Sequence, residues 1–484
     1  MATAQHQKLL ALAQAARDQS HWSRAIELYG KLAEEAPQSA EYQHNLGLCY
    51  LGMGNPRQAL VACRKAFELN PRFWQSAIVI AKAYKQLDQV SEAQQGFKAV
   101  LAIDPDNASA RLGLADLALN YFGEPYAAID WVKPLKDSEY AMDVSLTTMM
   151  AKLYDRPGWD TEQSAIDLTQ DIFAFSKEYL RLPNLMLPPL LKRPISAAGG
   201  RARPRVGLLS PLFCASPVYF LTIAKWQGMA QHCDLVMLNR GHNNDWATEE
   251  FRQLSVDWMD VQHMSATDLA MSIHGANLDV LYDLGGWMDP VGLQALSVKP
   301  ARQMFKWVGG QSVTTGLETF DGWVGDKHHT PMNLQHLYSE PILHIKGSYV
   351  SYTPPPYLPK PATKKLKTPC VFANPAKVSE PFLAELNKLP GKKIFIHRQY
   401  RYAQVQERIA AALDGKVEFV IPKTHEEALQ EINRHATMID TFPYSSGLTA
   451  REALSMDTNI QVLRVGQLFC ERHTSFLAKP VASL

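Results

Sequence analysis

Residues 38–71 read QSAEYQHNLGLCYLGMGNPRQALVACRKAFELNP, and the chain repeats this pattern at intervals of 34 residues. The prolines recur at Pro37, Pro71 and Pro105. Four further positions recur in the same register, occupied by Ala25, Ala59, Ala93 and Ala127; by Leu46, Ile80 and Leu114; by Gly47, Ala81 and Ala115; and by Tyr29, Cys63, Phe97 and Trp131. Small residues allow two helices to cross closely, and proline ends a helix. The period therefore predicts a stack of helical hairpins.

This period and residue pattern are typical of the tetratricopeptide (TPR) repeat. Four hairpins fit within residues 1–140, and the fourth is weakened because Glu139 stands where proline is expected. Residues 141–180 keep a helical periodicity, and we expect them to cap the last apolar face. Stacked repeats present a concave surface to another chain. Residues 1–180 thus predict a protein-binding domain.

Composition bounds the class of protein. The 484 residues leave room for about three domains of ordinary size. The chain is 46% hydrophobic and 20% charged, which favours packed cores over disorder. The 49 Lys and Arg residues nearly balance the 48 Asp and Glu residues, and the net charge is +1. This balance predicts neither a nucleic-acid partner nor binding to an anionic membrane.

The cysteines and the apolar segments indicate a compartment. The six cysteines are scattered without a CxxC pair, at Cys49, Cys63, Cys214, Cys233, Cys370 and Cys470. We expect reduced, buried thiols rather than disulfides or a zinc site. No apolar run approaches the roughly 20 residues that span a bilayer, and the N-terminus has no signal-peptide pattern. A cytoplasmic protein without membrane insertion is predicted.

The rest of the chain alternates between short apolar runs and helical periodicity. After a Pro- and Gly-rich linker at 181–204, strands are expected at 205–210, 234–238, 278–283 and 302–308, with a helix at 217–230. After a second, proline-rich linker at 351–369, strands are expected at 370–373, 393–397, 417–421, 436–440 and 459–463, with helices near 379–388, 403–413, 425–434 and 447–456. Such alternation predicts parallel sheets covered on both faces. We expect two Rossmann-like lobes, 205–350 and 370–484, facing across a cleft, which is the GT-B architecture of glycosyltransferases.

Ligands of open parallel sheets bind beyond the carboxyl ends of the strands. In the second lobe these ends carry polar residues: Asn374 and Lys377, His397, Lys423, and Asp440 with the loop Ser446-Gly447-Leu448-Thr449. That loop opens a helix, so its hydroxyls, its backbone N–H groups and the helix dipole suit a phosphate or diphosphate. Lys377 could neutralise a diphosphate leaving group.

Each of these residues also has an ordinary structural interpretation. Ser446, Gly447 and Thr449 could simply cap the helix, Lys377 could be a solvated lysine, and His397 could satisfy a backbone hydrogen bond. A metal is not predicted. The pair His328-His329 has no third ligand in register, and the Asp-x-Asp at residues 104–106 falls in a repeat turn.

TPR repeats followed by two such lobes resemble the O-linked N-acetylglucosamine transferases, glycosyltransferase family 41 with its bacterial and plant relatives. Matching segments occur in order at 278–286, 299–309, Thr314-Thr-Gly316, Asp321, 338–340 and Arg472. In the last lobe, Asn374 and Lys377 fall near the family's Asn and its diphosphate-contacting Lys, and 440–449 resembles its Asp-Thr-x-x-x-Asn-Gly-x-Thr-Thr loop.

The chain also departs from the family pattern. Ser216 replaces a His and Leu212 an Asp after the first strand of the catalytic region. In the donor loop, Ser446 replaces Asn, Leu448 replaces His and Ala450 replaces Thr, and Trp287 stands where the family has His or Tyr. The chain ends at Leu484, so a shortened C-terminal tail is expected.

The resemblance implies an inverting, metal-independent transferase that moves a sugar, N-acetylglucosamine in the family, from a UDP-sugar to Ser or Thr of a protein held by the repeats. Lys377 would be catalytic, and Asn374, Lys423, Asp440 and 446–449 would bind the donor. Ser216, Asp283 and His397 are the candidates for a general base or an acceptor contact. The departures leave open a TPR scaffold with a degenerate transferase domain. Transfer to a small glycan is a third reading.

Overall fold

The computed structural model describes residues 2–190, 203–309 and 313–477. It divides the chain into two compact units, Met1–Thr147 and Thr148–Leu484. The first unit is helical in its described part, and the second contains both sheets. None of the described helices is long and apolar enough to cross a lipid bilayer.

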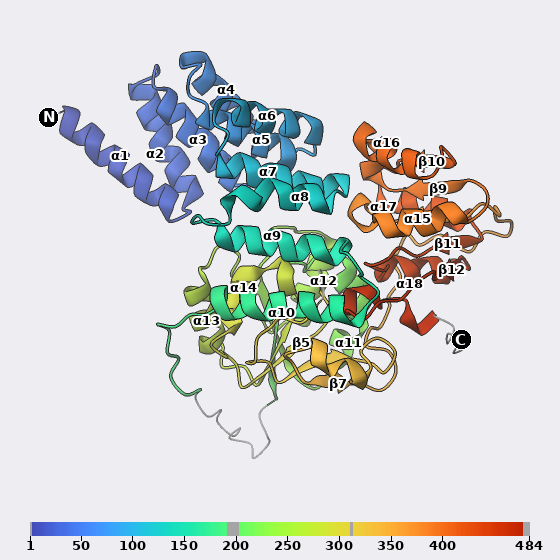
Figure 1. The fold of residues 1–484 in the computed structure, drawn as a ribbon. Coiled ribbons are helices and arrows are strands. Elements are labelled where there is room, and N and C mark those ends of the chain that lie inside the picture. Colours follow the sequence, from blue (N-terminus) through green and yellow to red (C-terminus); the bar gives the residue numbers. More distant parts are fainter. Residues whose placement is uncertain (1, 191–202, 310–312, 478–484) are drawn as a thin grey trace. The chain divides into compact units, whose positions relative to one another are not determined.

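The first unit is the predicted series of helical hairpins, coloured blue to cyan in Figure 1. Its helices are α1 (Ala2–Asp18), α2 (Trp22–Glu35), α3 (Ala40–Gly52), α4 (Pro56–Leu69), α5 (Gln75–Gln86), α6 (Val90–Ile103), α7 (Ala108–Leu117) and α8 (Pro125–Val132). The predicted fourth hairpin is irregular, because a π-helical turn at Ala118–Phe122 follows α7 and α8 is short.

Local chemistry explains the boundaries of these helices. The side chains of Ser39, Asn55 and Asn107 accept hydrogen bonds from backbone N–H groups and cap the helices that follow them. The recurrent small residue has a steric reason at Gly47, where an added Cβ would lie 2.2 Å from the Cys63 sulfur. Two helices of one hairpin therefore approach too closely there for a side chain.

The second unit begins inside helix α9 (Ala141–Tyr154) and continues with α10 (Glu162–Tyr179). This differs from the sequence prediction, which grouped 141–180 with the repeats as a cap. Helix α10 packs on the first lobe: Ser176 Oγ donates to the Thr315 carbonyl at 2.6 Å, and Phe175 meets Trp287 edge-on. The segment before α10 reaches the second lobe, because Tyr154 stacks on Tyr444 and Trp159 on Phe442.

The first lobe contains a seven-stranded parallel sheet in the order β3-β2-β1-β4-β5-β6-β7. The strands are β1 (Arg205–Ser210), β2 (Asp234–Asn239), β3 (Asp257–Asp260), β4 (Val280–Asp283), β5 (Gln303–Lys306), β6 (Gly322–Gly325) and β7 (Ile342–His344). The helices are α11 (Pro217–Ala230), α12 (Trp246–Leu254), α13 (Ala266–Gly275) and α14 (Pro290–Leu296). Sequence reasoning missed β3, β6 and β7.

The second lobe contains a five-stranded parallel sheet in the order β10-β9-β8-β11-β12. Its strands are β8 (Cys370–Phe372), β9 (Lys393–Ile396), β10 (Val417–Val420), β11 (Thr437–Ile439) and β12 (Asn459–Gln461). Its helices are α15 (Glu380–Lys388), α16 (Ala403–Ala412), α17 (His425–Asn433) and α18 (Leu448–Ser455). All nine predicted elements of this lobe are present, so the prediction of two Rossmann-like lobes is confirmed.

Two linker segments are predicted, at 181–204 and at 351–369. The 351–369 stretch forms neither helix nor strand, and it lies along α11, where Thr353 N–H donates to the Phe220 carbonyl. The first predicted linker, 181–204, falls partly outside the described residues, at 191–202.

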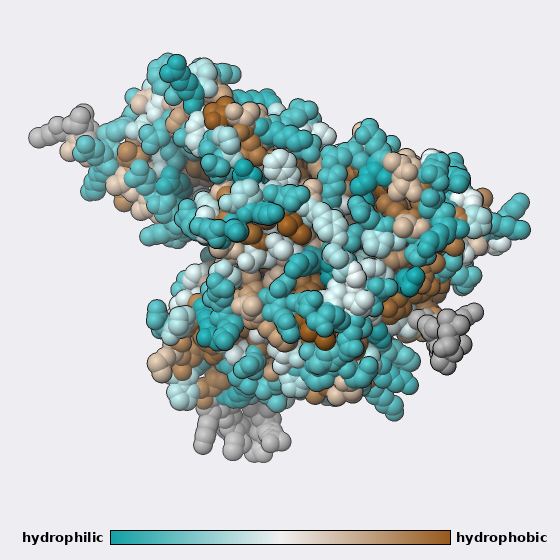
Figure 2. All heavy atoms as spheres, viewed as in Figure 1, coloured by the Kyte–Doolittle hydropathy of each residue, from teal (hydrophilic) through white to brown (hydrophobic). Residues whose placement is uncertain are grey.

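Hydrophilic side chains predominate on the face drawn in Figure 2, with hydrophobic ones in separate patches. All six cysteines are buried and free of disulfides.

Candidate functional site

Both sheets have a point where the strand order reverses, and one cavity receives the loops from both. In the first sheet the reversal lies between β1 and β4, and in the second between β8 and β11. A cavity of about 380 Å³ is lined by Leu212 and Pro217 after β1, Met288 after β4, Lys377 after β8, and Tyr444 and the 447–449 loop after β11. Such switch points are where open α/β sheets bind their ligands.

Lys377 is the cation of this cavity. It ends a short 3-10 turn, Pro375–Lys377, whose start is capped by Asn374, since Asn374 Oδ1 accepts from the Lys377 backbone N–H at 3.2 Å. The ammonium donates to the Ser445 carbonyl at 3.1 Å and lies 4.4 Å from the centre of the Tyr444 ring. Burial lowers the pKa of Lys377 to about 8, against the opposing effect of Asp440. The charge is therefore poorly solvated and suited to meet an anion.

The loop before α18 is held in place by a buried carboxylate. Asp440 accepts a hydrogen bond from the Ser446 backbone N–H at 2.8 Å and another from the Thr474 hydroxyl. Burial raises the pKa of Asp440, and these hydrogen bonds and Lys377 act against the rise. Within the described residues, no side chain caps α18 at Gly447. The start of this helix therefore offers backbone N–H groups to an anion.

The structure sorts the predicted donor-site residues into three groups. Lys377, Gly447, Leu448 and Thr449 line the cavity. Asn374, Asp440 and Ser446 do not line it: Asn374 accepts from the lining Lys377, and Asp440 holds Ser446, which precedes the lining Gly447. The exposed Lys423 is not among the lining residues, and its backbone N–H donates to Glu427. Lys423 thus lies outside this cavity, and its contact with the donor stays a prediction.

None of the three base candidates lines the cavity. Asp283 accepts from the backbone N–H groups of Gly285 and Gly286 and lies 3.5 Å from the buried Lys306 ammonium. Ser216 Oγ donates to the Leu212 carbonyl at 2.9 Å. His397 caps the 3-10 turn that follows β9, where its Nδ1 accepts from the Gln399 N–H. The tertiary structure gives each of these groups a local structural partner.

Sequence reasoning missed several lining residues. His425 and Glu452 form a close pair, with His425 Nε2 3.3 Å from Glu452 Oε1. Glu452 is buried, and neither of its carboxylate oxygens accepts a hydrogen bond from the described residues. His425 follows β10, so the rule about strand ends could have found it. Glu452 lies one turn inside α18, where that rule does not reach.

A cluster of rings closes one side of the cavity. His473 Nδ1 lies 3.0 Å from His329 Nε2 and 3.3 Å from the Tyr349 hydroxyl. Burial lowers the pKa of His473 to about 3, and it also lowers the pKa of His329. Both imidazoles are therefore neutral at pH 7. The neutral His473 ring is therefore held by His329 and Tyr349 in the cavity wall.

Comparisons with known proteins agree with this architecture. The family model described as tetratricopeptide repeat matches residues 40–73. A probable UDP-N-acetylglucosamine–peptide N-acetylglucosaminyltransferase SPINDLY from Solanum lycopersicum is 23% identical over 273 residues, 52% of this chain and 29% of that protein. The probable transferase SEC from Arabidopsis thaliana is 25% identical over 160 residues, 32% of this chain and 16% of that protein. This chain thus spans less than a third of the length of either plant relative.

A solved structure matches over nearly the whole chain. It is a mutant O-GlcNAc transferase from Thermobaculum terrenum, with a TM-score of 0.61 and 21% sequence identity. The match covers 98% of this chain and 85% of that one. At this identity the likeness establishes the fold: TPR helices followed by two parallel-sheet lobes of the GT-B type.

Proposed function

We propose that the chain is a divergent, TPR-containing relative of glycosyltransferase family 41 and acts as a UDP-sugar-dependent protein glycosyltransferase, a proposal supported by the repeats, the distant plant relatives and the shared fold. The acceptor is Ser or Thr of a polypeptide held by the repeats, and N-acetylglucosamine is the first sugar to test. One observation carries the proposal: Lys377 and the uncapped start of α18 meet at a single cavity where both sheets reverse their strand order.

The proposed reaction uses these two features on the leaving group. The diphosphate of the donor binds at the backbone N–H groups of Leu448 and Thr449, with the Lys377 ammonium beside it. The acceptor oxygen forms a bond to the anomeric carbon as the bond to the phosphate oxygen breaks, which inverts that carbon. Lys377 and the helix N-terminus stabilise the charge that grows on UDP. The neutral imidazole of His473 lies in the same wall.

Such a displacement also needs a group that receives the acceptor's proton. Glu452 is the candidate that the cavity offers, because its buried carboxylate has unfilled oxygens and His425 Nε2 lies 3.3 Å away. A carboxylate in this position can accept a hydrogen bond from an entering hydroxyl. We propose Glu452 for this role in place of Ser216, Asp283 and His397.

A second candidate function rests on the same residues. Since Ser216, Asp283 and His397 have structural partners and do not line the cavity, the transferase lobes could serve as a binding platform for a TPR scaffold. In that case the cavity retains a ligand without turning it over. Sugar transfer, rather than ligand binding, separates the two functions.

The test is calorimetric titration of the full chain with UDP and with UDP-N-acetylglucosamine. Lys377→Ala is expected to weaken binding by about tenfold or more, on the order of 1.4 kcal/mol. The matched control is Lys423→Ala, which removes an exposed lysine of the same lobe outside the cavity and is expected to bind as the unchanged protein does. Absence of binding by the folded, unchanged protein would refute the UDP-sugar proposal. Binding without transfer to any polypeptide would favour the scaffold.

A further inference from the structure

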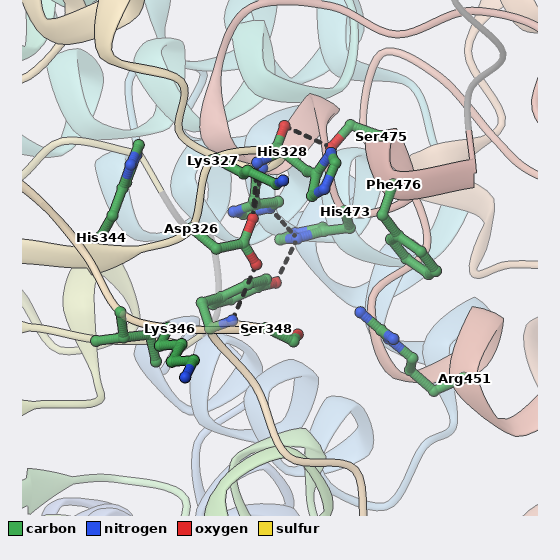
Figure 3. A pocket seen from close by; sticks show the side chains of 14 residues that line it. Asp326, Lys327, His328, His344, Lys346, Ser348, Arg451, His473, Ser475 and Phe476 are labelled. Atoms are coloured by element: carbon green, nitrogen blue, oxygen red, sulfur yellow. Dashed lines mark hydrogen bonds between the residues drawn. The ribbon is translucent and has the colours of Figure 1, made fainter.

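A second pocket adjoins the candidate active site. It has a volume of about 670 Å³ and is formed by the ends of β6 and β7, by α18 and by the segment 473–476 (Figure 3). Lys327 follows β6, Lys346 follows β7 and Arg451 lies in α18. The carboxyl ends of two neighbouring parallel strands and one helix of the other lobe therefore direct three cations to the same pocket.

These three cations outnumber the carboxylates that line the pocket among the described residues. The charge of Asp326 acts on Arg451 and offsets part of the excess. Asp326 is the acidic residue that lines the pocket, and backbone groups occupy its oxygens: His328 N–H and His329 N–H donate to one, and Tyr349 N–H donates to the other, each at 2.9 Å. In a chain with a net charge of +1, this is a local excess of positive charge.

Arg451 is the most constrained of the three. Its guanidinium lies 4.0 Å from the centre of the Phe476 ring, and the residue is partly buried. A guanidinium held on an aromatic face keeps its planar donors free for a carboxylate or a phosphate. Lys327 and Lys346 are exposed and add charge from the ends of the neighbouring strands β6 and β7. The pocket thus combines one guanidinium held against an aromatic ring with two exposed ammonium groups.

The pocket and the candidate active site share a wall. Tyr349 and His473 line both. On α18, Arg451 lines the basic pocket, while Leu448, Thr449 and Glu452 line the active-site cavity. An anion at Arg451 would therefore lie beside a donor bound at the start of α18, not in the donor's own position.

We propose that this basic pocket is an acceptor subsite, which binds an acidic side chain of the polypeptide next to the residue that receives the sugar. The inference rests on the proposed function, because it names the acceptor that function needs. The diphosphate of the donor already has Lys377 and the helix N-terminus, so the three further cations serve a different anion. A carboxylate and a phosphate monoester have the required charge and acceptor oxygens.

The test uses three fluorescent peptides of equal length, each with a central serine, flanked by glutamates, by glutamines or by phosphoserines. Binding to the full chain, saturated with UDP, is followed by fluorescence anisotropy. The glutamate and phosphoserine peptides are expected to bind about tenfold more tightly than the glutamine peptide, on the order of 1.4 kcal/mol. The variant Lys327→Gln/Lys346→Gln, and separately Arg451→Gln, should remove most of this preference.

The control variant is Lys364→Gln/Lys367→Gln, which removes two exposed lysines that line neither pocket, and it should keep the preference. Equal binding of the glutamine peptide, or a preference that survives in the pocket variants, would overturn the proposal. Displacement of the acidic peptides by inorganic phosphate at equal concentration would overturn it too, since that indicates a site for free anions. Titration with UDP alone tests the proposed function separately, so failure of either one can be recognised.

Discussion

Arg156 and Glu471 form a buried ion pair, with Arg156 Nη1 2.6 Å from Glu471 Oε1 and side chains that are 3% and 0% exposed. Glu471 also accepts from the backbone N–H groups of Gln467 and Leu468, and Arg156 donates to the Trp159 carbonyl. The pair joins the segment before α10 to the 3-10 turn Phe469–Glu471. His473 and Thr474, which contact the candidate site, follow this turn directly.

Replacing Arg156 should destabilise the second unit. Arg156→Ala leaves the Glu471 carboxylate buried without its counter-ion, which costs about 3–5 kcal/mol in comparable pairs. Hydrogen exchange of the peptides that contain β8 to β12 measures the loss. Arg464→Ala, which breaks only exposed ion pairs, is the control and should change exchange little. Adding Glu471→Gln to Arg156→Met should recover part of the loss, and no loss in Arg156→Ala would contradict this account.

Docking of α10 on the first lobe depends on a glycine. Gly316 has φ +72, and a Cβ there would lie 2.5 Å from Ser176 Oγ and 3.0 Å from the Ile172 carbonyl oxygen. Gly316→Ala should therefore lower the melting temperature, because it combines a strained backbone with a clash against α10. Gly228→Ala is the matched control, since no atom lies within 4 Å of its added Cβ. It lies inside α11, where alanine should be neutral or stabilising.

The affinity for UDP should fall as the pH rises through about 8. Burial lowers the pKa of Lys377 to about 8, so the free protein loses this positive charge at and above that pH, whereas the diphosphate stays ionised. Calorimetry across this range measures the effect. Lys377→Ala should bind weakly at every pH, and an equal pH dependence in that variant would assign the effect to another group.

The ionisation of Lys377 also predicts how stability changes with pH: the free energy of unfolding should rise with pH, whereas the affinity for UDP should fall. The folded pKa of Lys377, about 8, lies below the ordinary value of 10.5, so between these values the unfolded chain binds more protons than the folded one. Lys377 therefore adds to the free energy of unfolding as pH rises through this window, and the contribution is lost as pH falls through about 8. Urea unfolding of the unchanged protein and of Lys377→Met should differ in slope against pH only there.

Glu452→Gln distinguishes two uses of the buried carboxylate. If Glu452 receives the proton of the acceptor, the variant should bind UDP normally and lose sugar transfer by a factor on the order of 10²–10⁴. His425→Gln, which removes the neighbour at 3.3 Å, should lower transfer less. Weaker UDP binding by Glu452→Gln, with transfer reduced only in proportion, would instead assign the carboxylate to donor binding.

Local patterns in the sequence were enough for the repeat hairpins and for the order of strands and helices in the second lobe. The 34-residue period fixes where close helix crossings occur, as at Gly47 against Cys63, and each strand-helix unit of the second lobe has its own apolar run. Because the carboxyl ends of parallel strands meet at one edge of a sheet, the sequence alone predicted that Lys377 and the 447–449 loop lie close together, and both line the cavity.

Only the tertiary structure decided which side chains face the cavity. The carboxylate of Asp283 follows a strand as the rule requires, yet it is occupied by the N–H groups of Gly285 and Gly286. Tyr349 lies in a loop, Glu452 inside a helix, and His473 in a turn near the C-terminal end of the described residues. Tyr349 and His473 are more than 100 residues apart in the sequence, and only tertiary packing brings them together. Helix α10 likewise has the periodicity of a repeat helix but packs on the first lobe. Periodicity reports which face of an element is buried, and it carries no information about which distant element buries it.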